Sequence, residues 1–257
     1  MPIPHRKRVR FGKNPLVEVV FQAQFNSLLE IEQELPVRFH TAVRDQFPVF
    51  NLSSFVEIPV GPVQGPASPS AMRHYEMGSV DGRWKIALTS TFLALATTVY
   101  DSWDEFRKNA HFALDGFFGS YRPAFFSRVG LRYRDLISRD SLGLKDVPWR
   151  DLISPHISGV LGADGLDEGE LIGMRGVFAL SLRDDLHVQV QHGIVEGPTG
   201  GRDYVIDSDY FTEPMVEATT DATIEALDGF RPYPNDLFQW SISDRLRDAM
   251  EPVEQDG

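Results

Sequence analysis

Three arginine residues share one face of a predicted strand in the middle of the chain. Arg128, Arg132 and Arg134 occupy even positions, and the odd positions between them are apolar. Because successive side chains of a strand point to opposite sides of a sheet, one side faces a core and the other carries guanidinium groups. Such a row binds phosphate or carboxylate when its charges have no internal partner. Ion pairing within the chain is the alternative that we favour, with Asp135 and Asp140 as acidic neighbours.

A second group of cations would lie near the arginine row if the sheet is curved. Lys85 follows Trp84 on the predicted strand 84–89, and Arg83 lies directly before it in the predicted turn. Cations beside an aromatic ring are typical of surfaces that bind single-stranded nucleic acid. The same open face would also suit an acidic segment of a partner protein.

The weak candidates for a metal site are Asp207 and Asp209, which share a face of the predicted strand 204–212, and His187 on the predicted strand 186–191. Carboxylate and imidazole groups that converge from neighbouring strands can hold Mg²⁺ or Mn²⁺. The alternative, which we favour, is a water-facing polar side of an antiparallel sheet, because alternation itself produces such a side.

Other patterns of catalysis are missing from the sequence. There is no Gly-x-Ser-x-Gly elbow, no Gly-x-Gly-x-x-Gly loop and no Walker motif. The chain has no cysteine, which excludes disulfides, thiolate metal sites and a cysteine nucleophile. We therefore assign no catalytic residues, expect no cofactor and regard an enzyme as the less favoured class.

Composition is that of a soluble globular protein, with 42% hydrophobic and 24% charged residues among 257. The net charge of −12 opposes binding to nucleic acid and to anionic lipid. The sequence has no run of about 18 apolar residues, so we expect no membrane span, and the lack of cysteine fits a reducing cytoplasm. Residues 1–13 are basic and contain no acid, which predicts a flexible N-terminal arm.

The most strongly patterned element is a predicted helix over residues 102–119. Ser102 followed by Glu105 fits a capping box, and apolar residues recur at spacings of three and four up to Phe117. Pro123 prevents the helix from continuing.

Period-two and period-3.6 patterns predict the remaining elements. The predicted strands are 15–25, 55–60, 73–79, 84–89, 91–100, 126–138, 173–182, 186–191 and 204–212. The predicted helices are 26–44 with a break at Pro36, 148–153, 221–227 and 235–250, and 61–70 is a predicted loop.

The order of these elements indicates an internal duplication. Ala113–Phe117 is repeated letter for letter at Ala226–Phe230, an offset of 113. We expect an α+β fold in which two β-α-β-β-β-α halves, 14–121 and 122–251, surround a mostly antiparallel curved sheet. The arrangement resembles the TATA-binding-protein-like and helix-grip folds. An acidic tail, 252–257, follows the second half.

Three stretches carry a resemblance to a known family. Asn14–Phe25, Asn-Pro-Leu-Val-Glu-Val-Val-Phe-Gln-Ala-Gln-Phe, looks like the opening of a sporadically distributed prokaryotic family of uncharacterised proteins, Arg128–Tyr133 resembles its central strand, and Phe238–Met250 resembles its closing helix. An Asn typical of that family after the central strand is missing, and Phe230 replaces a typical His ahead of the closing helix. The resemblance implies an accessory protein of patchy distribution, often near mobile elements, and implies no activity or catalytic residue.

These observations favour a non-enzymatic binding or regulatory module with a protein partner. The distribution of the family suggests a place in a mobile defence or toxin–antitoxin-type cassette. A nucleic-acid binder that uses the arginine face or the basic arm is the alternative, and a metal-dependent hydrolase is the third class.

Overall fold

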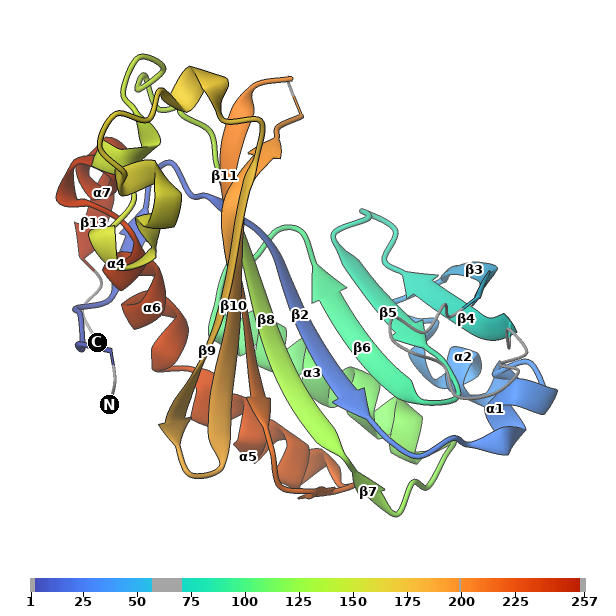
Figure 1. Cartoon of the computed structure of the whole chain (residues 1–257). Coiled ribbons are helices and arrows are strands. Elements are labelled where there is room, and N and C mark those ends of the chain that lie inside the picture. The colour runs from blue at the N-terminus through green and yellow to red at the C-terminus, as the bar shows by residue number, and fades with distance from the viewer. Residues whose placement is uncertain (1–2, 57–70, 199, 255–257) are drawn as a thin grey trace, which may run out of the picture. The chain divides into compact units, whose positions relative to one another are not determined.

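The protein is an α+β fold built on a nine-stranded sheet (Figure 1). The computed structural model describes residues 3–56, 71–198 and 200–254. The strands follow the order β3-β4-β5-β6-β2-β8-β11-β10-β9. The pairs β3–β4, β4–β5, β5–β6 and β10–β9 are antiparallel, which confirms the expected class and the mostly antiparallel sheet.

The elements have the following bounds. The strands of the large sheet are β2 (Leu16–Gln24), β3 (Val49–Val56), β4 (Ala71–Gly78), β5 (Trp84–Leu88), β6 (Phe92–Thr97), β8 (Arg128–Ile137), β9 (Met174–Arg183), β10 (Leu186–Glu196) and β11 (Arg202–Thr212). Two small sheets pair β1 (Val9–Phe11) with β13 (Pro252–Glu254) and β7 (Phe125–Phe126) with β12 (Val216–Glu217). The α-helices are α1 (Leu29–Gln33), α2 (Val37–Val43), α3 (Trp103–Phe118), α4 (Pro155–Ser158), α5 (Thr220–Phe230), α6 (Tyr233–Ser241) and α7 (Asp244–Ala249). Three short 3-10 helices are η1 (Trp149–Asp151), η2 (Gly159–Gly162) and η3 (Glu168–Glu170).

Most of the predicted elements are present, and the differences have local causes. The first predicted helix is divided into α1 and α2 at Pro36, as expected. The last predicted helix is divided into α6 and α7, because extended backbone at Ile242 and Ser243 interrupts it and Ser243 caps α7. Strand β3 begins at Val49, six residues before the start of the predicted strand 55–60, and includes its first two residues; 57–60 and the predicted loop 61–70 lie outside the described residues.

The chain divides into two compact units. Unit 1 contains Met1–Val19, Arg132–Phe211 and Gly229–Gly257, and unit 2 contains Val20–Leu131 and Thr212–Asp228. The expected halves, 14–121 and 122–251, do not coincide with these units, because most of α5 belongs to unit 2 together with α3. No helix among the described residues is long and apolar enough to cross a membrane.

The core of unit 2 forms around the apolar stripe of α3. The Ser102 hydroxyl accepts a hydrogen bond from the backbone N–H of Glu105 at 3.2 Å, so the predicted cap is present. The ring of Phe117 lies 5.2 Å from that of Phe25 and 6.3 Å from that of Phe39, centroid to centroid. At Gly116 a Cβ atom would lie 2.8 Å from a methyl group of Val43, so only glycine allows α2 to pack this closely against α3.

Helices α3 and α5 are joined by reciprocal contacts within unit 2. The carboxylate of Asp228 on α5 accepts hydrogen bonds from Trp103 Nε1 at 2.8 Å and Arg107 Nε at 3.1 Å. The hydroxyl of Thr220 on α5 donates to the Asp115 carboxylate on α3 at 2.8 Å. The two helices therefore pack antiparallel, with the beginning of each beside the end of the other.

Residues 3–13 pack within unit 1 and do not form the flexible arm that their charge predicts. Strand β1 pairs with β13, and Phe11 contacts Phe238 on α6 edge to face at 5.6 Å. The buried Asp236 carboxylate accepts a hydrogen bond from the backbone N–H of Arg6 at 2.9 Å and lies 3.1 Å from His5 Nδ1. Arg6, Lys7 and Arg10 remain exposed, so backbone pairing and a buried acceptor hold the segment in place without desolvating these charges, which composition alone does not reveal. Residues 1–2 and 255–257 lie outside the described part of the chain.

We predict that Asp228→Ala lowers the free energy of unfolding by about 1–3 kcal/mol, because it leaves the N–H of an indole that is only 6% exposed without its acceptor. Asp115→Ala is the matched control. Its carboxylate is 57% exposed, so we expect a loss of less than about 0.5 kcal/mol. Urea unfolding followed by circular dichroism measures both values, and equal losses would contradict the assignment.

Candidate functional site

The arginine row lies on the face of β8 that its sequence pattern predicts, and Arg132 is paired inside unit 1. The guanidinium of Arg132 donates from Nε at 2.6 Å and from a terminal nitrogen at 2.5 Å to the carboxylate of Asp207 on β11. This hydrogen bonding raises the pKa of Arg132. A two-point ion pair removes the charge that an anionic ligand would need, so the internal pairing that we favoured is present at this position.

The two other arginines of the row have different surroundings. The side chain of Arg128 lies across Gly130 on the same face, where a Cβ atom would collide with the guanidinium. Arg134 is exposed. Asp135, which we expected as a partner for the row, lies on the opposite face of β8 and is buried, because it is one residue out of phase with Arg132 and Arg134.

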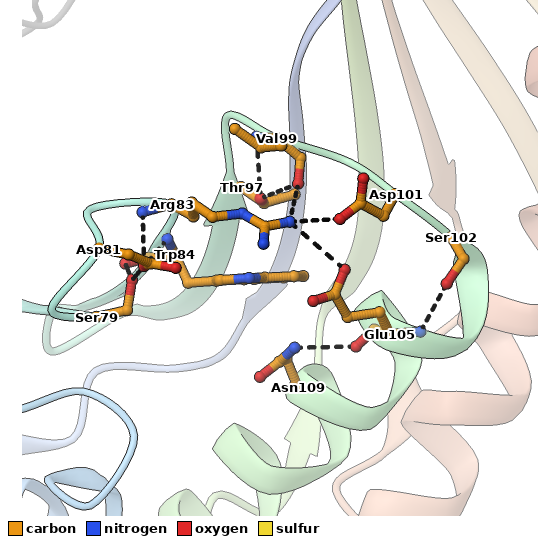
Figure 2. A network of polar contacts seen from close by, with 10 residues as sticks. All are labelled: Ser79, Asp81, Arg83, Trp84, Thr97, Val99, Asp101, Ser102, Glu105 and Asn109. Carbon is orange, nitrogen blue, oxygen red and sulfur yellow. Dashed lines mark hydrogen bonds and ion pairs between the residues drawn. The ribbon is translucent and has the colours of Figure 1, made fainter.

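Arg83 and Lys85 of unit 2 are also neutralised within the chain. Figure 2 shows Arg83 reaching from the turn after β4 toward the beginning of α3, where it lies 2.6 Å from Asp101 and 3.8 Å from Glu105. Its hydrogen bond with Asp101 raises the pKa of Arg83. Lys85 lies 3.1 Å from the carboxylate of Glu76. This network connects the β4–β5 hairpin to the capped end of α3 and does not present free cations.

The weak metal candidates do not form a cluster. Asp207 is occupied by Arg132, and Asp209 follows two residues later on the same strand. His187 on β10 has its ring 5.7 Å from that of Phe211. Among the described residues there is no group of three or more histidine, aspartate or glutamate side chains that could hold a metal ion.

Asp135 is the most perturbed acid of unit 1. Its side chain lies among apolar residues of β8 at 8% exposure, and burial, with a smaller contribution from Asp207, raises its pKa to about 8 from an ordinary value of 3.8. The fully buried Tyr210 on β11 has a raised pKa, mainly because of burial, and Asp135 and Asp236 add to that effect. A protonated carboxyl is the form that this environment favours.

The feature of unit 1 that the sequence patterns did not reveal is the outer side of β9, here called the β9 edge. Strand β9 is ten residues long and ends the strand order, and among the described residues its backbone ladder is formed with β10 alone. Its only charged residues are Arg175 near one end and Arg183 at the other. Arg183 pairs with Asp185 at 2.6 Å, and Arg175 donates a hydrogen bond to Gln191.

An aromatic patch, formed by Phe178, Trp240 and His156, includes a side chain of this strand. Phe178 on β9 lies 6.4 Å from Trp240 on α6, centroid to centroid, and Trp240 stacks on His156 of α4 at 4.8 Å and 19°. Phe178 and Trp240 are half-buried and His156 is exposed. The patch brings together three positions that are distant in the sequence, so no local motif predicts it. The only sequence feature that points to this part of the sheet is the absence of acidic residues from β9.

A comparison of this chain with known proteins finds no matching family model and no matching curated sequence.

We predict that the chain is hardly retained on heparin at low salt and that Asp207→Asn increases its retention. The substitution releases Arg132 from its ion pair and leaves a cation on the polar face. Asp184→Asn, on the turn after β9, changes the net charge equally and serves as the control. Strong wild-type retention that falls steeply with salt and is lost in Arg132→Ala would instead support the nucleic-acid alternative.

We predict that stability falls as pH rises between about 4 and 8, because folded Asp135 keeps a proton that the unfolded chain releases above its ordinary pKa of 3.8. The stabilisation that Asp135 contributes to the folded state is fully present below its unfolded pKa of 3.8 and is lost as pH rises past its folded pKa of about 8. Its slope is at most about 1.4 kcal/mol per pH unit. Urea unfolding at several pH values should show a flatter profile for Asp135→Asn than for the wild type. Asp140→Asn, an exposed control, should leave the profile unchanged; identical slopes for all three proteins would refute the prediction.

Proposed function

We propose that the chain is a non-enzymatic protein-binding module, and that unit 1 binds an extended segment of a partner along the β9 edge. The observation that carries the proposal is a ten-residue edge strand with an uncharged interior from Gly176 to Leu182. Natural sheets protect their edges with short strands, prolines, bulges or inward-pointing charges. The interior of β9 has no proline or charge, so its backbone groups are available to a further strand.

The contacts offered by the β9 edge are of two kinds. Backbone N–H and C=O groups on the outer side of β9, which pair with no other strand in the described part of the chain, supply hydrogen bonds, and these provide affinity in complexes formed by strand addition. The aromatic patch adds apolar area on one face, and aromatic side chains are enriched at the centres of protein interfaces. On the other face Val177 is 59% exposed. An added strand would cover part of the aromatic patch on one face and Val177 on the other.

A role as an accessory protein in a mobile defence or toxin–antitoxin-type cassette is part of this proposal. Its support is the resemblance of Asn14–Phe25 and Arg128–Tyr133 to the patchily distributed prokaryotic family. A binding module without chemistry of its own fits the regulatory half of such a cassette.

We also propose that the fold arose by duplication and is related to the TATA-binding-protein-like or helix-grip arrangement. The reciprocal contacts of α3 and α5 support this. Thr220 lies 113 positions after Arg107, and Asp115 lies 113 positions before Asp228, so the contacts Arg107–Asp228 and Thr220–Asp115 join equivalent positions of the two halves. The strand orders β3-β4-β5-β6-β2 and β9-β10-β11-β8 support it as well. In the first half β2, the first strand, lies beside β6, the last, and in the second half β8 lies beside β11 in the same way.

The binding proposal is tested by selecting random 12-residue peptides displayed on phage against the immobilised chain. We expect the selected peptides to be rich in β-branched and aromatic residues and to bind about tenfold or more weakly to the double variant Val177→Lys, Ala179→Lys. Lysine is a residue that natural edge strands use against pairing.

The control places the same change on another exposed valine. Val80, in the turn after β4, is 85% exposed, and Val80→Lys should bind the peptides like the wild type. Peptides that bind both lysine variants equally well, or no enrichment of any peptide, would refute the assignment to the β9 edge.

A further inference from the structure

We infer that the occupant of the β9 edge is a second copy of this chain, paired antiparallel through β9 in both copies. The inference rests on the proposed function, because it identifies the partner of the same edge. It predicts a symmetric dimer in which the sheet continues from one copy into the next, and it also predicts the register of that pairing.

The register follows from the alternation of faces. In an antiparallel pair, residues directly opposite each other lie on the same face. When β9 of one copy pairs with β9 of the other, even-numbered residues therefore face even-numbered residues and odd-numbered residues face odd-numbered ones. A two-fold axis at Phe178 places Val177 opposite Ala179 of the second copy and Arg175 opposite Ser181. Moving the axis to Ala179 would place Arg175 opposite Arg183, which is unfavourable because like charges would face each other.

The register centred on Phe178 is self-complementary on both faces. On the face that carries the aromatic patch, Phe178 meets its own copy, Gly176 meets Leu180 and Met174 meets Leu182. An edge with no acid could also attract an acidic strand from another protein. However, Arg183 is already paired with Asp185, so only Arg175 near one end of β9 could meet an acid, and the interior from Gly176 to Leu182 offers it no partner. The second copy matches the uncharged interior along its whole length.

The interface is small, so its affinity is modest. A single strand pair and one central aromatic cluster lie at the low end of the areas that stable complexes bury. We therefore expect a concentration-dependent monomer–dimer equilibrium in the micromolar range, which analytical ultracentrifugation of the full chain measures.

An engineered cysteine tests the register directly, because the chain contains no cysteine of its own. Opposite residues of an antiparallel pair have Cα atoms about 4.5–5.5 Å apart, within the range that a disulfide spans. Phe178→Cys should therefore give a disulfide-linked dimer under mild oxidation. Met174→Cys is the control: its copies would be about eight residues, or roughly 27 Å, apart along the ladder, so it should remain monomeric.

A second test uses charge at Ser181, which is exposed on β9. Ser181→Glu would place a carboxylate opposite Arg175 of the second copy twice in each dimer, and we expect about threefold to tenfold tighter association. Ser181→Lys would place a like charge there and should weaken association by a similar factor. High salt should reduce both effects.

The outcomes separate this inference from the proposed function. A chain that stays monomeric, with no cross-link at position 178 and no response to either Ser181 variant, overturns the dimer, whereas peptide binding at the β9 edge would still support the proposed function. Cross-linking of Met174→Cys at the same rate as Phe178→Cys overturns the register. The absence of both dimer and peptide binding overturns both proposals.

Discussion

The alternation of side chains along each strand is the constraint on which the features of unit 1 depend. On β8 the guanidinium of Arg132 lies at the polar face, whereas Asp135, three residues later, is buried in the core. The same rule places Asp207 on the polar face of β11 and Tyr210 in the core. A displacement of one residue in the pairing of β8 would bury Arg132 and expose Tyr133, and on β11 it would bury Asp207 and expose Tyr210, so the register is strongly specified.

The residues that could be predicted are those whose environment depends on near neighbours in the sequence. Period and capping located α3, and alternation assigned Arg132 to the polar face of β8. The identity of ion-pair partners could not be predicted, because it depends on which strands are adjacent: Arg132 pairs with Asp207, 75 positions away, and not with Asp135. Composition was misleading for the N-terminal segment, since its docking depends on a single buried acceptor, Asp236, 230 positions from Arg6.

The charges of the chain are arranged to cancel locally. Three of the cations that were candidates for binding have carboxylate partners: Arg132 with Asp207, Arg83 with Asp101 and Lys85 with Glu76. With a net charge of −12, acids outnumber bases, so a cation on the surface has a high chance of meeting an acid nearby. An acidic chain of this kind would therefore bind a partner more readily through backbone and apolar groups than through charge.

Along the β9 edge of unit 1 this arrangement of charges is missing between Arg175 and Arg183. A charge or a proline in the interior is one way in which natural edge strands avoid pairing; on β9 a proline would remove a backbone donor, and a charge at position 178 would disturb the packing against Trp240. The chain instead confines charge to the two ends of β9, where Arg175 and Arg183 limit the register without blocking the backbone between them. In the proposed dimer the uncharged interior of one copy lies along that of the other, so the edge strand of each copy is covered by the same pairing and no free β9 edge is left for a further strand.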